Sequence, residues 1–204
     1  MRALLAALGV VLVLVPAGAH AKPVIVVLGD SITAGLGVAQ DEAFPALLEA
    51  RLRSEGYAYR VVNAGVSGDT TAGGLRRVDW VLRSGPEIVI VALGANDGLR
   101  GQSPRGMRAN LEGIVSRLRA AGARVLLAGM RMPPNYGAEY TREFEAVFPI
   151  VARRANATFM PFLLEGVAAD PALNQPDGIH PNAAGHRVIA DRLWPYLRPL
   201  LKKP

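Results

Sequence analysis

Short runs of β-branched and aliphatic residues recur along the chain and predict five strands. The predicted strands are residues 24–28, 59–63, 87–93, 124–128 and 158–160. The first four runs are each followed closely by a glycine, and the fifth run is the weakest. The first and third runs are apolar almost throughout, which is typical of parallel strands that helices cover on both faces.

Longer stretches between and after these strands carry hydrophobic residues at helical spacing. They predict helices over residues 42–55, 104–121, 139–155 and 183–200. Strands and helices alternate, the loops between them are short, and no repeat is visible. The sequence therefore predicts one α/β domain, a three-layer α/β/α sandwich in which a five-stranded parallel sheet lies between helices.

The N-terminal segment has a different pattern. Arg2 is followed by an apolar run over residues 4–15, a proline, and the small-x-small sequence Ala19-His20-Ala21. This layout predicts a signal peptide over residues 1–21 and a mature domain over residues 22–204 that is periplasmic or secreted. An uncleaved membrane anchor is the alternative, since the uncharged stretch is nearly long enough to span a bilayer.

The amino-acid composition excludes several kinds of functional site. The 204 residues include no cysteine, which excludes a disulfide scaffold, a thiolate metal site and a cysteine nucleophile. The formal net charge is +6, but the basic residues form scattered pairs, which we interpret as solvated helix faces. These pairs are Arg76-Arg77, Arg117 with Arg119, Arg153-Arg154 and Lys202-Lys203. We expect no nucleic-acid partner, and peripheral contact with membrane lipid stays an alternative.

Glycines and polar side chains gather just after the predicted strands. The first strand is followed by Gly29-Asp30-Ser31, the second by residues 63–70, and the third by residues 94–98. Residues 177–182, Asp-Gly-Ile-His-Pro-Asn, precede the last helix. Because the carboxyl ends of parallel strands share one edge of a sheet, these groups are expected to meet there. They supply a hydroxyl, a carboxamide and an Asp/His pair, the parts of a nucleophilic acyl-transfer site.

The residues themselves leave alternatives. A serine hydroxyl needs a base, and outside the signal segment the chain contains two histidines, His180 and His186. His186 falls inside the last predicted helix and is expected to be a surface or packing histidine. His180 lies three residues after Asp177, a spacing that can bring a carboxylate and an imidazole together. Taken singly, Ser31 fits a helix cap, the Asp/His pair fits a capping cluster, and Asn96 fits an ordinary turn.

The four blocks in this order resemble the SGNH, or GDSL, hydrolase superfamily. The resemblance covers nearly all of the chain from residue 24 to the last helix. Within that superfamily the sequence looks most like bacterial periplasmic thioesterases that are also described as lysophospholipases and arylesterases. The runs that strengthen this closer match are Leu-Gly-Ala-Asn-Asp-Gly-Leu-Arg-Gly at 93–101, Asn-Tyr-Gly at 135–137 and residues 177–182.

The resemblance implies a flavodoxin-like fold and a role for each matching residue. Ser31 would be the nucleophile, His180 the general base and acid, and Asp177 the carboxylate that orients the imidazole. The backbone N–H groups of Ser31 and Gly68 and the side-chain amide of Asn96 would form the oxyanion hole. No cofactor is implied.

The remaining polar and apolar residues near these blocks have simpler interpretations. We read Asp30, Asp69 and Asp97 as hydrogen-bonding braces of the loops, and we expect no metal site. Residues that could line an acyl or aromatic pocket follow the strand ends. They are Leu99, Met132, Pro133, Pro134, Tyr136 and Ile179.

Together these observations predict a monomeric esterase or thioesterase that works through an acyl-serine intermediate. Its expected partner is a small-molecule acyl ester or thioester. One alternative is a carbohydrate O-acetylesterase, which the small number of tryptophans and tyrosines (2 and 5) disfavours. The other is a non-catalytic protein that binds acyl groups or lipids on the same scaffold.

Overall fold

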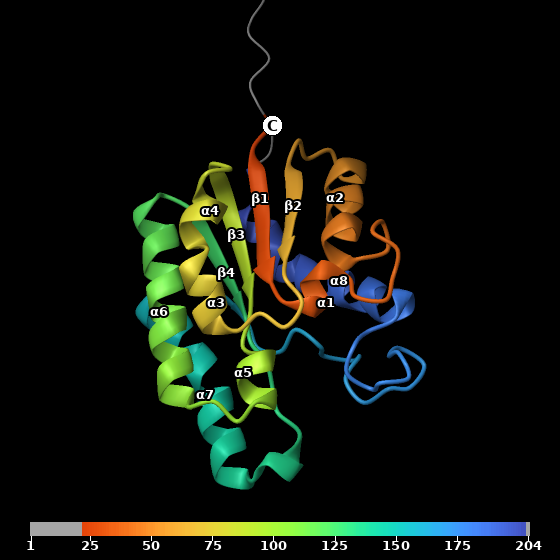
Figure 1. The fold of residues 1–204 in the computed structure, drawn as a ribbon. Helices are drawn as coiled ribbons and strands as arrows, with labels where there is room; N and C mark the ends of the chain where they lie inside the picture. The colour runs from red at the N-terminus through yellow and green to blue at the C-terminus, as the bar shows by residue number, and fades with distance from the viewer. Residues whose placement is uncertain (1–21, 203–204) are drawn as a thin grey trace, which may run out of the picture.

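The structure, a computed structural model, describes residues 22–202. The predicted signal peptide lies outside this range. Five parallel strands form one sheet in the order β2-β1-β3-β4-β5 (Figure 1). The strands are β1 (Val24–Gly29), β2 (Arg60–Gly65), β3 (Pro86–Ala92), β4 (Arg124–Ala128) and β5 (Thr158–Met160). All five strand predictions are confirmed, with ends that differ by one or two residues at most.

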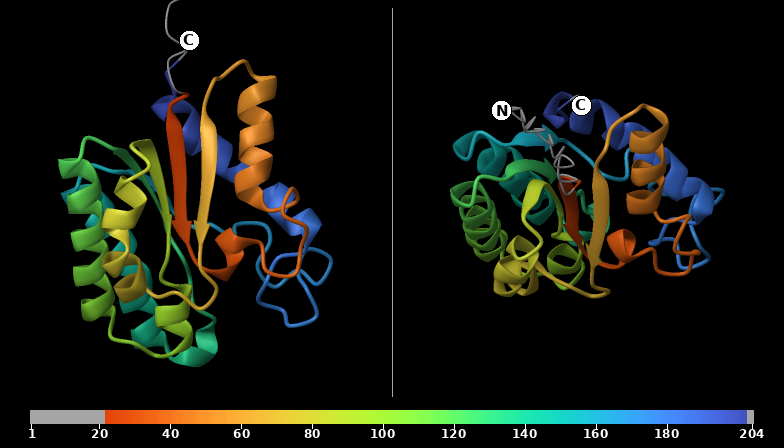
Figure 2. Two further views of the ribbon diagram at one scale, coloured as in Figure 1. Left: turned by 45° about the horizontal axis from the view of Figure 1, so that its top comes forward. Right: turned by 90° about the horizontal axis from the view of Figure 1, so that it is seen from above.

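Residues 22–202 contain eight helices. They are α1 (Ser31–Ala34), α2 (Phe44–Ser54), α3 (Thr71–Arg76), α4 (Val78–Leu82), α5 (Ala95–Leu99), α6 (Pro104–Ala120), α7 (Ala138–Arg154) and α8 (Ala183–Leu197), with 3₁₀ turns η1 (Pro134–Tyr136) and η2 (Arg198–Leu200). The four long helices α2, α6, α7 and α8 match the predicted ones. Helices α2 and α8 cover one face, and α3, α4, α6 and α7 cover the other (Figure 1 and Figure 2). This is the three-layer α/β/α sandwich that the alternating pattern predicts.

The distribution of the helices follows from right-handed crossovers. The chain passes from β1 to β2 in one direction across the sheet, then returns past β1 to β3 and continues to β5 in the other. Right-handed connections therefore place the first crossover helix, α2, on the opposite face from α3, α4, α6 and α7. The direction changes between β1 and β3, which is where open α/β sheets form their ligand crevice.

Burial agrees with the strand order. Every residue of β1 is buried, and β3 is buried except at Glu87, as expected for interior strands. The edge strand β2 is largely half-buried or exposed. Within residues 22–202, no helix is both long enough and apolar enough to cross a membrane.

Four helices were not predicted. Helices α1, α3, α4 and α5 have only 4, 6, 5 and 5 residues, too few to show a hydrophobic period. Three of them, α1, α3 and α5, come shortly after β1, β2 and β3. Each turns the chain at the carboxyl edge of the sheet, and so these short helices set the positions of the polar residues there.

Candidate active site

Ser31 lies at the point where β1 turns into α1. It is the first residue of α1, and the helix cap is its neighbour Asp30, whose Oδ1 accepts a hydrogen bond from the backbone N–H of Ile32 at 3.1 Å. The helix-cap interpretation of Ser31 therefore does not hold, because Asp30 performs that role. Ser31 is buried, with 8% of its surface exposed. Its hydroxyl is free to bond away from its own helix.

The hydroxyl of Ser31 bonds to His180. Ser31 Oγ lies 2.9 Å from His180 Nε2, although the two residues are 149 positions apart in sequence. The other ring nitrogen, Nδ1, lies 2.7 Å from Oδ2 of Asp177. Hydroxyl, imidazole and carboxylate thus form one continuous chain of hydrogen bonds. An imidazole bonded in this way can accept the hydroxyl proton while the carboxylate fixes its tautomer.

Asp177 is held as a carboxylate. Its Oδ1 accepts hydrogen bonds from the backbone N–H groups of His180, at 3.0 Å, and Ile179, at 2.9 Å. These two bonds, and to a smaller extent the bond from the His180 ring, lower the pKa of Asp177 to about 2. Asp177 is therefore ionised at neutral pH, with Oδ2 directed at His180.

The loop that carries Asp177 and His180 is fixed at both ends. Gln175 donates from Nε2 to the carbonyl of Leu36 at 2.6 Å and to that of Pro181 at 3.0 Å. Because Leu36 follows α1, this side chain ties the loop to the segment that holds the serine. Asn182 caps α8 by accepting bonds from two backbone N–H groups. The Asp/His pair is therefore not the capping cluster of α8.

Gly68 and Asn96 lie just past the ends of β2 and β3, the two strands that neighbour β1. Gly68 follows β2 and has φ +79°, a left-handed conformation that suits glycine. Its carbonyl accepts a hydrogen bond from Arg100 at 2.9 Å. Asn96 is in α5, directly beyond β3, and its Nδ2 lies 3.5 Å from Oδ2 of Asp30. Both residues are thus brought to the same edge of the sheet as Ser31.

Asp30 is a buried carboxyl at this edge, with 2% of its surface exposed. Burial raises its pKa to about 6, against the lowering effect of the Ile32 N–H and of His180. Asp97 is also buried and accepts bonds from the backbone N–H and hydroxyl of Thr71, at 2.8 and 2.5 Å. Asp69 pairs with Arg77 at 2.7 Å. All three aspartates act as the loop braces that the sequence predicts.

His186 is a packing histidine, one of the two roles that the sequence predicts for it. Its ring is fully buried and stacks on Phe44, with 6.2 Å between the ring centroids. Its Nδ1 accepts the backbone N–H of Phe44 at 3.3 Å. Burial lowers the pKa of His186 to about 4, so the ring is neutral at physiological pH.

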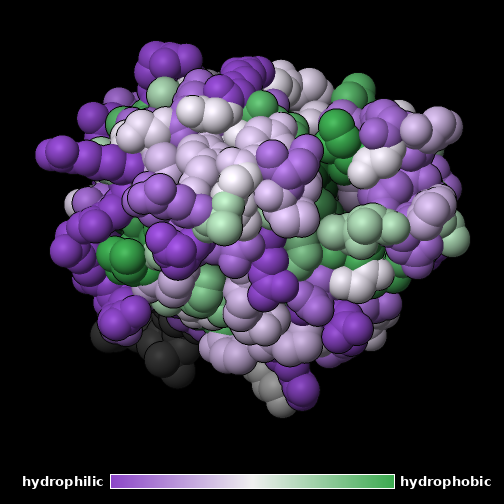
Figure 3. Space-filling model, turned by 90° about the horizontal axis from the view of Figure 1, so that it is seen from below, coloured by the Kyte–Doolittle hydropathy of each residue, from purple (hydrophilic) through white to green (hydrophobic). Residues whose placement is uncertain are grey.

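An apolar pocket opens beside Ser31. Its volume is about 350 Å³, and Ile32, which follows the serine, is part of its lining. Five of the six predicted pocket residues also line it, namely Leu99, Met132, Pro133, Pro134 and Ile179. Further lining residues are Ala95, Met130, Phe162 and Leu164. Figure 3 views the end of the molecule to which the strands point, and shows a hollow bordered by hydrophobic residues on this face.

Tyr136 does not line this pocket. Its hydroxyl donates to the carbonyl of Leu99 at 3.3 Å, so the tyrosine contacts the pocket only through the backbone of a lining residue. Phe162 and Leu164 were missed by the sequence reasoning. The signal that could have found them is their position just past β5, where the strand-end rule also applies.

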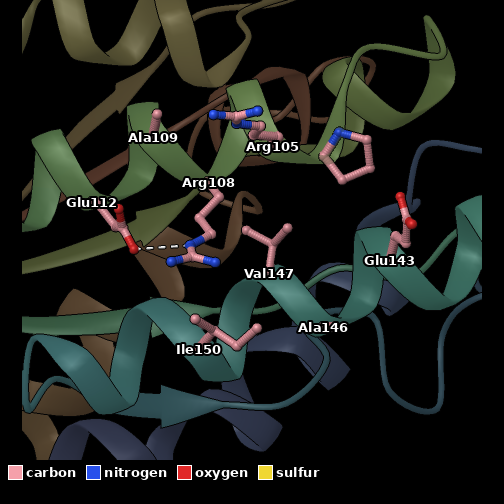
Figure 4. A pocket seen from close by; sticks show the side chains of 9 residues that line it. Arg105, Arg108, Ala109, Glu112, Glu143, Ala146, Val147 and Ile150 are labelled. Carbon is pink, nitrogen blue, oxygen red and sulfur yellow. Dashed lines mark hydrogen bonds and ion pairs between the residues drawn. The ribbon is translucent and has the colours of Figure 1, made fainter.

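A second cavity lies between α6 and α7, away from these residues. Its volume is about 480 Å³ (Figure 4). Arg108 faces Glu112 at 2.9 Å, and Val147 and Ile150 supply apolar surface. Its lining residues all belong to α6 and α7, and none comes from a strand end. Among residues 22–202, no group of three or more His, Asp or Glu side chains has the arrangement of a metal site.

Known proteins are similar to this chain over nearly all of its length. Esterase TesA of Pseudomonas aeruginosa is 46% identical over 202 residues, which cover 98% of this chain and 100% of the relative. Thioesterase 1/protease 1/lysophospholipase L1 of Escherichia coli (strain K12) is 40% identical over 191 residues, 93% of this chain and 90% of the relative. The crystal structure of TesA superposes with a TM-score of 0.85 at 46% identity, covering 87% of this chain and 99% of that one.

The family follows from the extent of these matches. The model of the GDSL-like lipase/acylhydrolase family matches residues 27–188, from β1 into α8. That span contains Ser31, Gly68, Asn96, Asp177 and His180. The chain belongs to the GDSL-like lipase/acylhydrolase family.

Proposed function

We propose that the protein is a serine hydrolase that cleaves carboxylic esters and thioesters through an acyl-Ser31 intermediate. The observation that carries the proposal is the hydrogen-bonded chain from Ser31 Oγ through the His180 ring to Asp177, with distances of 2.9 and 2.7 Å. The names of the relatives, an esterase and a thioesterase/lysophospholipase, support the same reaction class.

Acylation uses each group once. Ser31 Oγ attacks the substrate carbonyl while His180 Nε2 takes the hydroxyl proton, and Asp177 stabilises the imidazolium. The backbone N–H groups of Ser31 and Gly68 and the amide of Asn96 donate to the oxyanion. The C–O or C–S bond then breaks, and His180 returns the proton to the leaving alcohol or thiol.

Deacylation repeats the cycle with water. His180 takes a proton from the water as its oxygen attacks the acyl carbonyl, and the same donors hold the second oxyanion. The bond to Ser31 Oγ breaks, His180 returns the proton to it, and the carboxylic acid leaves. The Ser31 proton thus leaves on the alcohol or thiol, a water proton replaces it on Oγ, and His180 carries both, with no cofactor involved.

The pocket beside Ser31 supports a preference for small acyl or aryl groups. Its volume of about 350 Å³ is near the lower end for ligand pockets, and its walls are mostly apolar. We expect the enzyme to act as a monomer on small-molecule esters. Short and medium acyl chains should fill the pocket, whereas long chains must extend across the exposed side chains of Leu99 and Ile179.

The test is a hydrolysis panel with p-nitrophenyl esters of graded chain length, an acyl-CoA and a lysophospholipid. The wild type should hydrolyse the short and medium esters fastest, and Ser31→Ala should lower kcat by about 10³- to 10⁶-fold with the fold intact. Binding of these ligands without hydrolysis would instead support a non-catalytic binding protein. Hydrolysis that persists in Ser31→Ala would remove the serine from the mechanism.

The proposed location is the periplasm or the exterior, because residues 1–21 have the sequence of a cleavable signal. Mass spectrometry of protein recovered from the periplasmic or secreted fraction should find an N-terminus at Lys22. An N-terminus at Met1 in the membrane fraction would favour the uncleaved anchor.

A further inference from the structure

Arg77 joins three separate backbone segments at the carboxyl edge of the sheet. Its Nε donates to Oδ2 of Asp69 at 2.7 Å, its Nη1 to the carbonyl of Ala64 at 2.7 Å, and its Nη2 to the carbonyl of Gly29 at 2.9 Å. Gly29 ends β1, Ala64 is in β2, and Asp69 lies in the loop between β2 and α3. One guanidinium thus holds the ends of two strands and the loop that follows them.

The position of Arg77 corrects an expectation from the sequence. We interpreted Arg76-Arg77 as part of a solvated helix face. Arg76 is exposed, whereas the side chain of Arg77 is only 18% exposed and that of Asp69 only 10%. The helical conformation is interrupted between α3 and α4 at Arg77, which has φ −107° and ψ 9°. This break separates the two neighbouring arginines and gives them different surroundings.

The three contacts of Arg77 flank two of the proposed oxyanion donors. Gly29 lies two residues before Ser31, and its carbonyl also accepts the backbone N–H of Val66 at 3.1 Å. Asp69 directly follows Gly68, and the turn over this segment closes with a bond from Asp69 N to the carbonyl of Val66 at 3.0 Å. The spacing between the amides of Ser31 and Gly68 therefore depends on how firmly β1, β2 and the loop are joined.

Asp69 is itself held in a fixed position. Its Oδ1 accepts the backbone N–H of Thr70 at 3.1 Å and lies against Gly73, where a Cβ atom would overlap it. With Oδ1 fixed on α3, the pairing of Oδ2 with Arg77 links the guanidinium to the loop beside Gly68. A lysine cannot reproduce the arrangement, because a single ammonium cannot offer three donors in the fixed plane of a guanidinium.

We infer that Arg77 is a positioning residue that sets the geometry of the oxyanion hole by holding Gly29, Ala64 and Asp69 together. The inference rests on the proposed function. Arg77 contacts Asp69 and the carbonyls of Ala64 and Gly29, and does not touch the reacting atoms. It keeps the backbone N–H of Gly68 and that of Ser31 at the separation that a tetrahedral oxyanion requires, so its loss weakens transition-state binding more than substrate binding.

The test compares Arg77→Met, Arg77→Lys and the matched control Arg76→Met. For each variant, kcat and KM are measured on a p-nitrophenyl ester well below the melting temperature, together with the Ki of an alkyl trifluoromethyl ketone. This ketone forms a tetrahedral adduct with the serine, so its affinity reports on the oxyanion hole. A purely structural role of Arg77 would lower the melting temperature and leave both kcat and the Ki of the folded fraction unchanged.

For Arg77→Met we expect kcat to fall by about 10- to 100-fold and the Ki of the ketone to rise by a similar factor, because small misplacements of catalytic groups have effects of this size. KM should change by less than about threefold. Arg77→Lys should lie between Arg77→Met and the wild type, and Arg76→Met should stay within about twofold of the wild type in all three constants.

A second variant keeps the test decisive if Arg77→Met does not fold. Gly73→Ala adds a methyl group that would overlap Oδ1 of Asp69 and so displaces this carboxylate, while alanine favours the α3 helix. It should lower kcat and weaken ketone binding in the same proportion, by about 3- to 10-fold.

Two results overturn the inference: folded Arg77→Met with the kcat and Ki of Arg76→Met, or, where Arg77→Met does not fold, Gly73→Ala with wild-type constants. In both cases the wild type still hydrolyses esters, so the proposed function stands. If the wild type neither hydrolyses esters nor binds the ketone, the proposed function fails, and this inference fails with it.

Discussion

Replacing Asp177 by asparagine reverses the hydrogen bonding of the imidazole at almost constant shape. In the wild type, His180 Nδ1 donates to Oδ2 of Asp177 at 2.7 Å, which leaves Nε2 to accept the proton of Ser31. The other oxygen, Oδ1, is occupied by two backbone N–H groups. In Asp177→Asn the amide oxygen keeps these two bonds, so the NH₂ group faces His180.

This orientation selects the wrong tautomer. An NH₂ group donates to Nδ1, the ring proton moves to Nε2, and Nε2 can no longer accept the proton of Ser31. In serine hydrolases with this arrangement, the same exchange lowers kcat by about 10⁴-fold. The Asp177 side chain is 45% exposed, so water competes for the ring, and we expect a decrease of about 10³-fold. At about 1.4 kcal/mol per tenfold change, this is about 4 kcal/mol of activation free energy.

The assay is steady-state hydrolysis of p-nitrophenyl butyrate, with the melting temperature measured by circular dichroism. Asp170→Asn is the matched control, because Oδ1 of Asp170 accepts the backbone N–H of Ala172 at 2.9 Å in the same exposed segment without contacting the imidazole. It should keep kcat within about twofold of the wild type. A folded Asp177→Asn protein that loses less than about tenfold in kcat would refute the tautomer argument.

Three further predictions test other contacts. Asn96→Ala should lower kcat by about 10²- to 10³-fold through loss of an oxyanion donor, and a change confined to KM in the same ester assay would show that Asn96 only binds substrate. His186 has a pKa of about 4 in the fold against an ordinary value of 6.5, so its contribution to stability is complete above about pH 6.5 and is lost as the pH falls towards 4. The variant His186→Gln keeps an acceptor for the Phe44 N–H but has no titrating ring. When the pH is lowered from about 7 to about 4, its free energy of unfolding in urea should therefore fall by about 2 kcal/mol less than that of the wild type. Equal decreases in the two proteins would contradict this linkage. Gln175→Ala removes the hydrogen bonds to the carbonyls of Leu36 and Pro181. It should lower kcat for ester hydrolysis about threefold and the free energy of unfolding in urea by about 1–2 kcal/mol. If both values stay unchanged, the loop is held without Gln175.

The sequence could predict the fold because the hydrophobic periods are long. Strands β1 and β3 are apolar almost throughout, and α2, α6, α7 and α8 each present a hydrophobic stripe over three or more turns. The short helices α1, α3 and α5 could not be predicted in this way, since one or two turns do not establish a period. They begin two to six residues after the strands end, and the side-chain caps of α1 and α3 come from Asp30 and Thr70, the residues just before each helix.

The site could be predicted only as far as its edge of the sheet. The strand-end rule brings residues 31, 68 and 96 to one edge, but it gives no distance between Ser31 and His180, which are 149 positions apart. That distance depends on the Gln175 side chain and on the loop that ends at Asn182. The role of Arg77 was missed for a related reason, because an arginine beside another arginine looks the same in sequence whether it is solvated or bound to carbonyls.

The central claim is that Ser31 is the activated nucleophile, and labelling with a fluorophosphonate tests it most directly. The reagent reacts only with a serine whose hydroxyl is activated by its surroundings, and peptide mass spectrometry locates the adduct. The account predicts one phosphonyl group per chain, on Ser31, with ester hydrolysis lost in step with labelling. An actively hydrolysing protein that takes up no label, or that carries it on another residue, would contradict the account.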